Sequence, residues 1–355
     1  MQSLDNNTQV FLALVRGGLW ETEVRFSKFE PIDYSRVLSL AEEQSVVGLA
    51  AAGLEHVVDV KVPKEDVLQF VGQTLQLEQR NVAMNSFIGS LVDKMRKAEI
   101  YTLLVKGQGI AQCYERPLWR VSGDVDFLLS RDNYDKARAF LLPLSSGSKR
   151  EERYSQHLGI SIDSWYVEIH GSLRTGLSAS LDKEVDSVHR DVFYGGNVRS
   201  WQNDKTTVFL PSPDNDVFVV FTHFIKHFYK EGMTLRQVCD WCRLLWTFRG
   251  KIDADLLEKR LKRAKLMGEW RGFASLAVDY LGMPVEAMPL YEEKYRDHGS
   301  KLIAFILTGY SGNKIKDTYN VFKLFPWKTL CYTPSIFLNV NWLKIKERLF
   351  GDGNR

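Results

Sequence analysis

The spacing of apolar residues changes from a helical to a strand period near residue 100, and this change constrains the fold more than any other feature. Upstream, the segments that begin at Pro31 and Pro63 repeat apolar residues every three or four positions, as amphipathic helices do. From Ile100 to Val105 the chain is rich in β-forming residues, and after Asp214 the helical period returns. We therefore predict an α+β protein in which a mixed-sheet core lies between helical segments.

The same pattern divides the chain into units. We expect a helical region at 1–95, an α/β core at 96–212, a second helical region at 213–310 and a basic, aromatic tail at 311–355. Core strands are predicted at 100–105, 124–129, 157–162, 165–170 and 206–210, and Asp163-Ser164 is a plausible tight turn between two of them. The segment that begins at Pro63 is either one long helix or two.

Composition excludes several classes of protein. The 47 basic and 44 acidic residues leave a net charge of +3, too small to recruit the whole chain to nucleic acid or to an anionic membrane. No apolar stretch approaches the ~18 residues of a membrane span, and no basic start precedes the first apolar run. The four cysteines are too few for a disulfide framework, so we expect reduced thiols and a cytoplasmic protein. The Cys239-x-x-Cys242 pair falls in a helical pattern and is interpreted as two buried cysteines.

The tail differs in character from the rest of the chain. Residues 311–355 hold eight basic and three acidic residues, with aromatic side chains between them. Such a segment either packs against the protein through its aromatic residues or contacts a membrane surface or single-stranded nucleic acid. We favour packing against the protein.

Two acidic residues occupy the predicted strand at 124–129. Since side chains alternate along a strand, Asp124 and Asp126 point to the same face, with their Cα atoms about 7 Å apart. Glu168 occupies the strand at 165–170 and would join them if the two strands were neighbours. Carboxylates inside an apolar strand need compensation, and a divalent cation such as Mg²⁺ or Mn²⁺ would supply it. The alternative is that Asp124 caps a turn and Asp126 pairs with Arg120 or Lys106.

A glycine turn precedes this acidic strand. Lys106-Gly107-Gln108 lies where the strand at 100–105 gives way to a short helix, so free backbone amides and a lysine could bind phosphate. We predict that Lys106, the amides of Gly107 and Gln108, and Arg120 contact the phosphates of a nucleotide. Hydrogen-bond donors for phosphate that lie opposite metal ligands are the arrangement that metal-assisted nucleotidyl transfer needs.

These motifs resemble the uncharacterised nucleotidyltransferase family of the DNA polymerase beta-like superfamily. The resemblance covers roughly residues 96–245. It implies that Asp124 and Asp126 bind the metal, that Glu168 is the third carboxylate and that Gly107 begins the glycine turn, whereas Gln108 stands where the family has a small residue. It further implies an NTP donor and an unidentified hydroxyl acceptor. The motifs that carry it are Lys106-Gly107, Tyr114, Arg120, Gly123-Asp124-Val125-Asp126-Phe127-Leu128 and Val167-Glu168-Ile169-His170.

Other polar residues are candidates for lining the cleft. His223 and His227 stand at i and i+4 on one helical face, Asp240 follows on the next helix, and His170 shares a strand face with Glu168. Two other functions stay open: a nucleotide-binding sensor without turnover, and an adaptor that acts through residues 311–355. Calorimetry with NTPs would distinguish a sensor from an enzyme.

Overall fold

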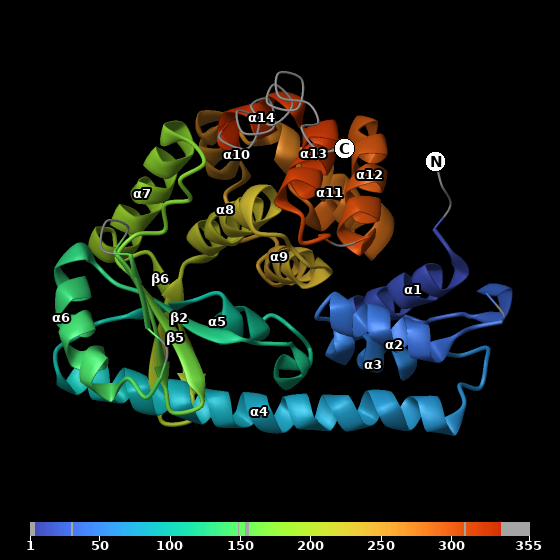
Figure 1. Ribbon diagram of the computed structural model, residues 1–355, viewed down its shortest axis with the longest axis horizontal. Coiled ribbons are helices and arrows are strands. Elements are labelled where there is room, and N and C mark those ends of the chain that lie inside the picture. Colours follow the sequence, from blue (N-terminus) through green and yellow to red (C-terminus); the bar gives the residue numbers. More distant parts are fainter. Residues whose placement is uncertain (1–3, 30, 148, 153–155, 309, 335–355) are drawn as a thin grey trace, which may run out of the picture.

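A computed structural model describes residues 4–29, 31–147, 149–152, 156–308 and 310–334. Figure 1 shows the sheet and a helical N-terminal group side by side above one long helix, with the C-terminal helices on the opposite side. The architecture is a mixed α+β fold, as the change of period predicts. No helix among these residues is both long and apolar enough to cross a membrane.

The N-terminal group consists of α1 (Asn6–Trp20), α2 (Tyr34–Glu43), α3 (Val47–Leu54) and the first half of α4 (Lys64–Lys97). Helices α1 and α3 cross so closely that a Cβ atom on Gly18 would clash with the carbonyl oxygen of Leu49. The segment after Pro63 is one helix of 34 residues. Its first half packs in the N-terminal core through Phe70 and Leu77, and its second half packs under the sheet through Met84 and Ile88.

The central sheet has five strands in the order β1-β2-β5-β4-β3. Strands β2 and β5 are parallel and the other neighbours are antiparallel, which makes the sheet mixed. A separate hairpin, β6-β7, packs beside β1. The elements of this region are β1 (Leu103–Val105), α5 (Gly107–Ala111), β2 (Asp124–Leu128), α6 (Arg131–Leu141), β3 (Lys149–Glu152), β4 (His157–Ile162), β5 (Trp165–His170), α7 (Ala179–Tyr194), β6 (Val198–Asn203) and β7 (Thr206–Pro211).

The two faces of the sheet have different roles. Val125 and Phe127 of β2, together with Val167 and Ile169 of β5, are fully buried in a core shared with α4 and α6. The alternation that buries these residues turns the acidic side chains to the other face. The sheet therefore has one apolar face that stabilises the fold and one polar face that is available for chemistry.

The C-terminal helices form a second layer that faces the polar side of the sheet (Figure 1). Their core is aromatic: Phe221, Trp241, Trp270 and Phe273 have ring centroids 4.7–6.5 Å apart. The elements are α8 (Pro213–Lys230), α9 (Leu235–Thr247), α10 (Ala254–Ala264), α11 (Met267–Leu281), α12 (Arg296–Thr308), α13 (Lys314–Leu324) and α14 (Pro326–Tyr332). Short 3-10 helices lie at Ser27–Phe29, Pro117–Trp119, Leu142–Leu144, Val285–Ala287 and Glu293–Tyr295.

Most predicted elements are confirmed, and the differences have local causes. The prediction did not include β3, β6 and α7. Strand β3 reads Lys-Arg-Glu-Glu and β6 buries no residue, so neither carries an apolar pattern. Helix α7 does carry one, with buried Leu181, Val185, Val188 and Val192 and an N-cap at Ser178, so the sequence held a signal that the prediction did not use. Cys239 and Cys242 are buried in α9 as free thiols, as predicted.

The described part of the tail packs on the C-terminal helices. The Phe325 ring lies 5.9 Å from the Phe228 ring, and the Tyr332 ring lies 4.8 Å from the Tyr229 ring. Packing against the protein therefore holds for α13 and α14, although the Trp327 side chain stays 81% exposed. Residues 335–355, which include Phe337, Trp342 and Phe350, lie outside the described residues.

Candidate active site

Three carboxylates meet on the polar face of the sheet. Strands β2 and β5 pair in parallel with Asp126 opposite Glu168, so Asp124, Asp126 and Glu168 share one face. One oxygen from each lies within 4.8 Å of the others. The two acidic segments, far apart in the chain, are therefore neighbours in the register that the sequence analysis required.

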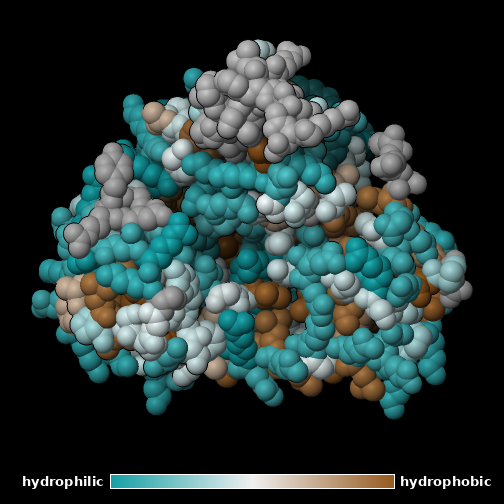
Figure 2. All heavy atoms as spheres, in the orientation of Figure 1, coloured by the Kyte–Doolittle hydropathy of each residue, from teal (hydrophilic) through white to brown (hydrophobic). Residues whose placement is uncertain are grey.

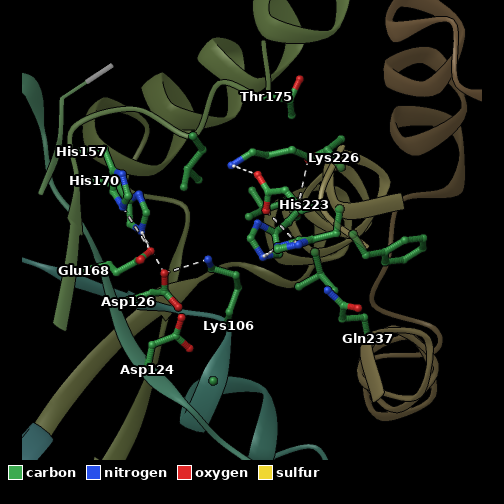
Figure 3. A pocket seen from close by; sticks show the side chains of 18 of the residues that line it. Lys106, Asp124, Asp126, His157, Glu168, His170, Thr175, His223, Lys226 and Gln237 are labelled. Atoms are coloured by element: carbon green, nitrogen blue, oxygen red, sulfur yellow. Dashed lines mark hydrogen bonds and ion pairs between the residues drawn. The ribbon is translucent and has the colours of Figure 1, made fainter. Parts of the chain in front are cut away.

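The glycine turn before β2 brings Lys106 to this cluster. Lys106 and Gly107 have φ angles of +59° and +45°, a left-handed conformation that glycine adopts without strain and lysine does not. The Lys106 Nζ lies 2.8 Å from Asp126 Oδ1, and both side chains are nearly buried (Figure 3). This pairing is the alternative that the sequence analysis left open for Asp126.

Two histidines flank the carboxylates on the other side. His170 Nε2 lies 2.9 Å from Asp126 Oδ1 and 3.4 Å from Glu168 Oε2, and His157 Nε2 lies 3.2 Å from Glu168 Oε2. The two imidazole rings stack with centroids 4.7 Å apart. His157 was not among the predicted site residues, although the predicted strands at 157–162 and 165–170 and the turn between them were enough to place it. A two-residue hairpin at Asp163-Ser164 pairs position 157 with position 170, as observed.

These contacts shift the pKa values of the acidic groups in different directions. The charge of Asp126, together with burial, raises the pKa of Asp124. Burial opposes ionisation of Asp126, but Lys106 and His170 outweigh it and hold its pKa below the ordinary value. Burial likewise opposes ionisation of Glu168, but His157 and His170 lower its pKa far below the usual range. Asp126 and Glu168 are therefore held ionised, whereas the fold disfavours the charge on Asp124.

The cluster lies in a cavity of about 350 Å³, within the roughly 300–1,000 Å³ typical of small-molecule sites. Helices α8 and α9 form the opposite wall, which includes His223 and Lys226 (Figure 3). His227 and Arg236 line the same wall. His223 Nε2 lies 3.0 Å from His227 Nε2. Burial and the charge of Lys106 lower the pKa of His223 well below its ordinary value, so this ring is neutral near pH 7. In Figure 2 this face of the molecule is hollowed near its centre.

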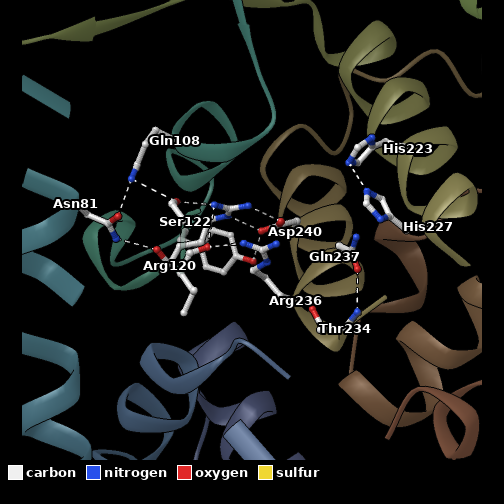
Figure 4. A network of polar contacts seen from close by, with 12 residues as sticks. Asn81, Gln108, Arg120, Ser122, His223, His227, Thr234, Arg236, Gln237 and Asp240 are labelled. Atoms are coloured by element: carbon white, nitrogen blue, oxygen red, sulfur yellow. Dashed lines mark hydrogen bonds and ion pairs between the residues drawn. The ribbon is translucent and has the colours of Figure 1, made fainter. Parts of the chain in front are cut away.

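The predicted cleft residues divide into two groups. His170, His223 and His227 line the cavity, as do Lys106, Gly107 and the three acidic residues. Asp240 does not line it. Its carboxylate accepts two hydrogen bonds from Arg120, at 2.7 Å each, and a third from the Tyr114 hydroxyl at 2.8 Å (Figure 4).

The side chains of Arg120 and Gln108 both make structural contacts. The Arg120 side chain lines the cavity, but its nitrogen atoms donate hydrogen bonds to Asp240, Ser122 and the Val121 carbonyl. It is therefore poorly placed to bind phosphate. The buried side-chain amide of Gln108 donates to Asn81 on α4 at 2.8 Å (Figure 4), whereas the phosphate contact of its backbone N–H stays a prediction. Polar side chains before β2 and in α5 thus hold these segments to α4 and α9, a role that spacing along the chain does not reveal.

The carboxylate cluster fits a hard divalent cation. Carboxylate oxygens are the ligands that Mg²⁺ and Mn²⁺ prefer, and one oxygen of each group lies within 4.8 Å of the other two. Among the described residues no hydrogen bond or ion pair reaches the Asp124 side chain, which leaves that carboxylate available. Holding three like charges this close together is costly, and a cation would offset that cost.

Comparisons with known proteins identify a family for this chain. Residues 30–282 match the family model described as uncharacterised nucleotidyltransferase. One solved structure with significant similarity is an antigenic nucleotidyltransferase-like protein from Paracoccidioides brasiliensis. It is 11% identical, with a TM-score of 0.34, and the match covers 57% of this chain and 93% of that one. No curated protein matches significantly.

Proposed function

Because the chain belongs to the uncharacterised nucleotidyltransferase family, we propose that it transfers a nucleoside monophosphate from an NTP to a hydroxyl acceptor, with release of pyrophosphate. The observation that carries this proposal is the convergence of Asp124, Asp126 and Glu168 within 4.8 Å at one wall of a cavity. Basic side chains on the opposite wall complement the acidic cluster, as a site for a metal-bound triphosphate requires.

In this proposal Asp124, Asp126 and Glu168 hold Mg²⁺ or Mn²⁺. The cation would neutralise charge that develops on the phosphate oxygens and lower the pKa of the acceptor hydroxyl. Glu168 is better suited to hold a cation than to accept a proton, because its low pKa makes it a weak base. Asp126 would release Lys106 once the cation shares its charge, and the lysine could then bind a phosphate oxygen.

The phosphate-binding residues differ from those that the sequence analysis named. Arg236 takes the place of Arg120, because it lines the cavity and its Nε atom has no hydrogen-bond partner among the described residues. One terminal nitrogen of Arg236 donates to the Val121 carbonyl at 2.9 Å, which fixes the orientation of the guanidinium. Lys226 lies beside it on α8 and would add a second cationic contact. Lys106 and the Gly107 amide would bind from the sheet side.

The test is transfer of label from NTPs carrying a labelled α-phosphate. The full chain is incubated with each NTP, Mg²⁺ or Mn²⁺ and a cell extract, and labelled products and pyrophosphate are measured. Asp124→Asn should abolish both, whereas Asp255→Asn, on the exposed first turn of α10, should leave both unchanged. Transfer that persists in Asp124→Asn, or that needs no divalent cation, would refute the proposal.

A nucleotide sensor is the second candidate. Gln108 stands where the family has a small residue, and its side chain anchors α5 to α4 instead of leaving the turn open. A less accommodating turn would favour binding over turnover. Calorimetry distinguishes the two: metal-dependent NTP binding without pyrophosphate release from any acceptor mixture would support the sensor.

A further inference from the structure

The carboxylate cluster is adjoined by a second group of potential ligands with different chemistry. We propose that His157, Glu168 and His170 form a site for a transition-metal ion such as Zn²⁺, next to the cation position defined by Asp124, Asp126 and Glu168. Glu168 belongs to both sets, and the ligand atoms of each set lie within 4.8 Å of one another. This inference goes beyond nucleotidyl transfer and does not depend on it.

The distances suit one ion shared by three ligands. Zinc binds imidazole nitrogen and carboxylate oxygen at about 2.1 Å, so two ligands at an angle of 90–110° lie roughly 3.0–3.5 Å apart. The Nε2 atoms of His157 and His170 lie 3.2 and 3.4 Å from Glu168 Oε2. Two of the three ligand pairs thus already have the spacing of a coordination shell, and the imidazole nitrogens lie within 4.8 Å of each other.

The scaffold places these ligands on two paired strands. The hairpin of β4 and β5 places His157 opposite His170 and Gly159 opposite Glu168, all on the polar face. The two imidazole planes differ by only 10° and the rings stack, so at least one ring must turn about its Cβ–Cγ bond to direct both nitrogen lone pairs at one ion. Gly159 has no side chain to crowd Glu168, and a Cβ atom there would clash with the Tyr166 hydroxyl group. Sites built on strands in this way are better preorganised than sites on loops.

The donor set selects the class of metal. Two imidazoles and one carboxylate favour Zn²⁺ and related first-row ions, whereas Mg²⁺ prefers oxygen ligands alone. His157 Nε2 is buried and lies 3.2 Å from Glu168 Oε2, within ion-pair range but without the geometry of a hydrogen bond. A buried nitrogen that is satisfied so incompletely is uncommon in folded proteins, and coordination of a metal ion would satisfy it.

A hydrogen-bonded network without a metal is the rival explanation. His170 Nε2 lies 2.9 Å from Asp126 Oδ1, where it can donate a hydrogen bond when it carries a proton. A metal ligand must instead offer the lone pair of that nitrogen. The two explanations therefore predict opposite results when transition ions are added.

The test is titration of the EDTA-treated full chain with Co²⁺, which reports its ligands by visible absorption, followed by Zn²⁺ competition. Wild-type protein should bind one Co²⁺ at this site, and Zn²⁺ but not a large excess of Mg²⁺ should displace it. His157→Asn should weaken binding at least about 100-fold, since loss even of an outer-shell partner costs roughly 10–100-fold. His223→Asn, in the same cavity but on α8, is the matched control and should leave the spectrum unchanged.

Separate variants distinguish failure of this inference from failure of the proposed function. Asp124→Asn should lose nucleotidyl transfer and keep the Co²⁺ spectrum, because Asp124 belongs only to the oxygen cluster. An unchanged spectrum in His157→Asn, or a spectrum lost in His223→Asn, would overturn the inference. If His157→Asn does not fold, the wild-type competition decides alone: displacement of Co²⁺ by Mg²⁺ as readily as by Zn²⁺ would overturn it.

Discussion

Asp124→Asn should stabilise the protein while it abolishes Mg²⁺ binding at the carboxylate cluster. Asp124 and Asp126 present oxygens within 4.8 Å of each other, and no described ion pair compensates Asp124. At that separation two unit charges repel by about 0.9 kcal/mol in water and about 3.5 kcal/mol at an effective dielectric constant of 20. Because the Asp124 residue is exposed, the lower figure applies, and we expect a gain of about 1 kcal/mol in the free energy of unfolding.

The same reasoning predicts a change of opposite sign in the free energy of unfolding two positions along the strand, at Asp126. Asp126 is buried and paired with Lys106, so Asp126→Asn would leave a nearly buried ammonium without its main partner. Breaking a buried pair costs about 3–5 kcal/mol, and the lower end applies here because Asp124 and Glu168 remain close to the lysine. Two isosteric substitutions of neighbouring metal ligands should therefore move stability in opposite directions.

Urea unfolding followed by circular dichroism, in EDTA and then in Mg²⁺, measures both effects. In EDTA the midpoint should rise for Asp124→Asn and fall for Asp126→Asn, with Asp255→Asn as the exposed control. Mg²⁺ should stabilise only the wild type and the control, because a ligand stabilises the folded state that binds it. A loss of stability in Asp124→Asn in EDTA, or equal stabilisation of that variant by Mg²⁺, would refute the electrostatic argument.

Three further predictions follow from contacts elsewhere. Asp240→Ala leaves the buried Arg120 unpaired and should lower the free energy of unfolding by about 3–5 kcal/mol in urea titrations. The double variant Arg120→Met/Asp240→Leu should recover most of the lost stability, and no recovery would contradict a structural role for the pair. Gly18→Ala forces α1 away from α3 and should lower the free energy of unfolding, measured by thermal unfolding, by about 1–3 kcal/mol. Gly72→Ala on α4, where open space surrounds the glycine, should be neutral or stabilising by up to about 1 kcal/mol. Burial opposes the charged form of His170, but hydrogen bonds to Asp126 and Glu168 raise its pKa above 6.5. The stabilisation by charged His170 is therefore complete below pH 6.5 and is lost as pH rises through the folded-state pKa. The destabilisation caused by His170→Gln in EDTA should be larger at pH 6 than at pH 9, and the reverse trend would contradict this reasoning.

Part of this site followed from the sequence because it depends on local geometry. The alternation of side chains along a strand places Asp124 and Asp126 on one face whatever the rest of the fold. The two-residue turn at Asp163-Ser164 likewise determines that His157 lies opposite His170, even though the sequence analysis did not use that signal. Periods of two and 3.6 residues are properties of short segments, so strands and helices could be located from them.

Only the tertiary structure decided which of these local features meet. The parallel pairing of β2 with β5 joins residues 42 positions apart, Asp126 and Glu168, and no local rule requires it. Arg120 could have faced a phosphate, but it pairs with Asp240, which follows 120 residues later on α9. A charged side chain turns to whichever opposite charge packing brings within reach. Its partner is therefore set by long-range contacts, whereas its position on a strand or helix is set by its neighbours in sequence.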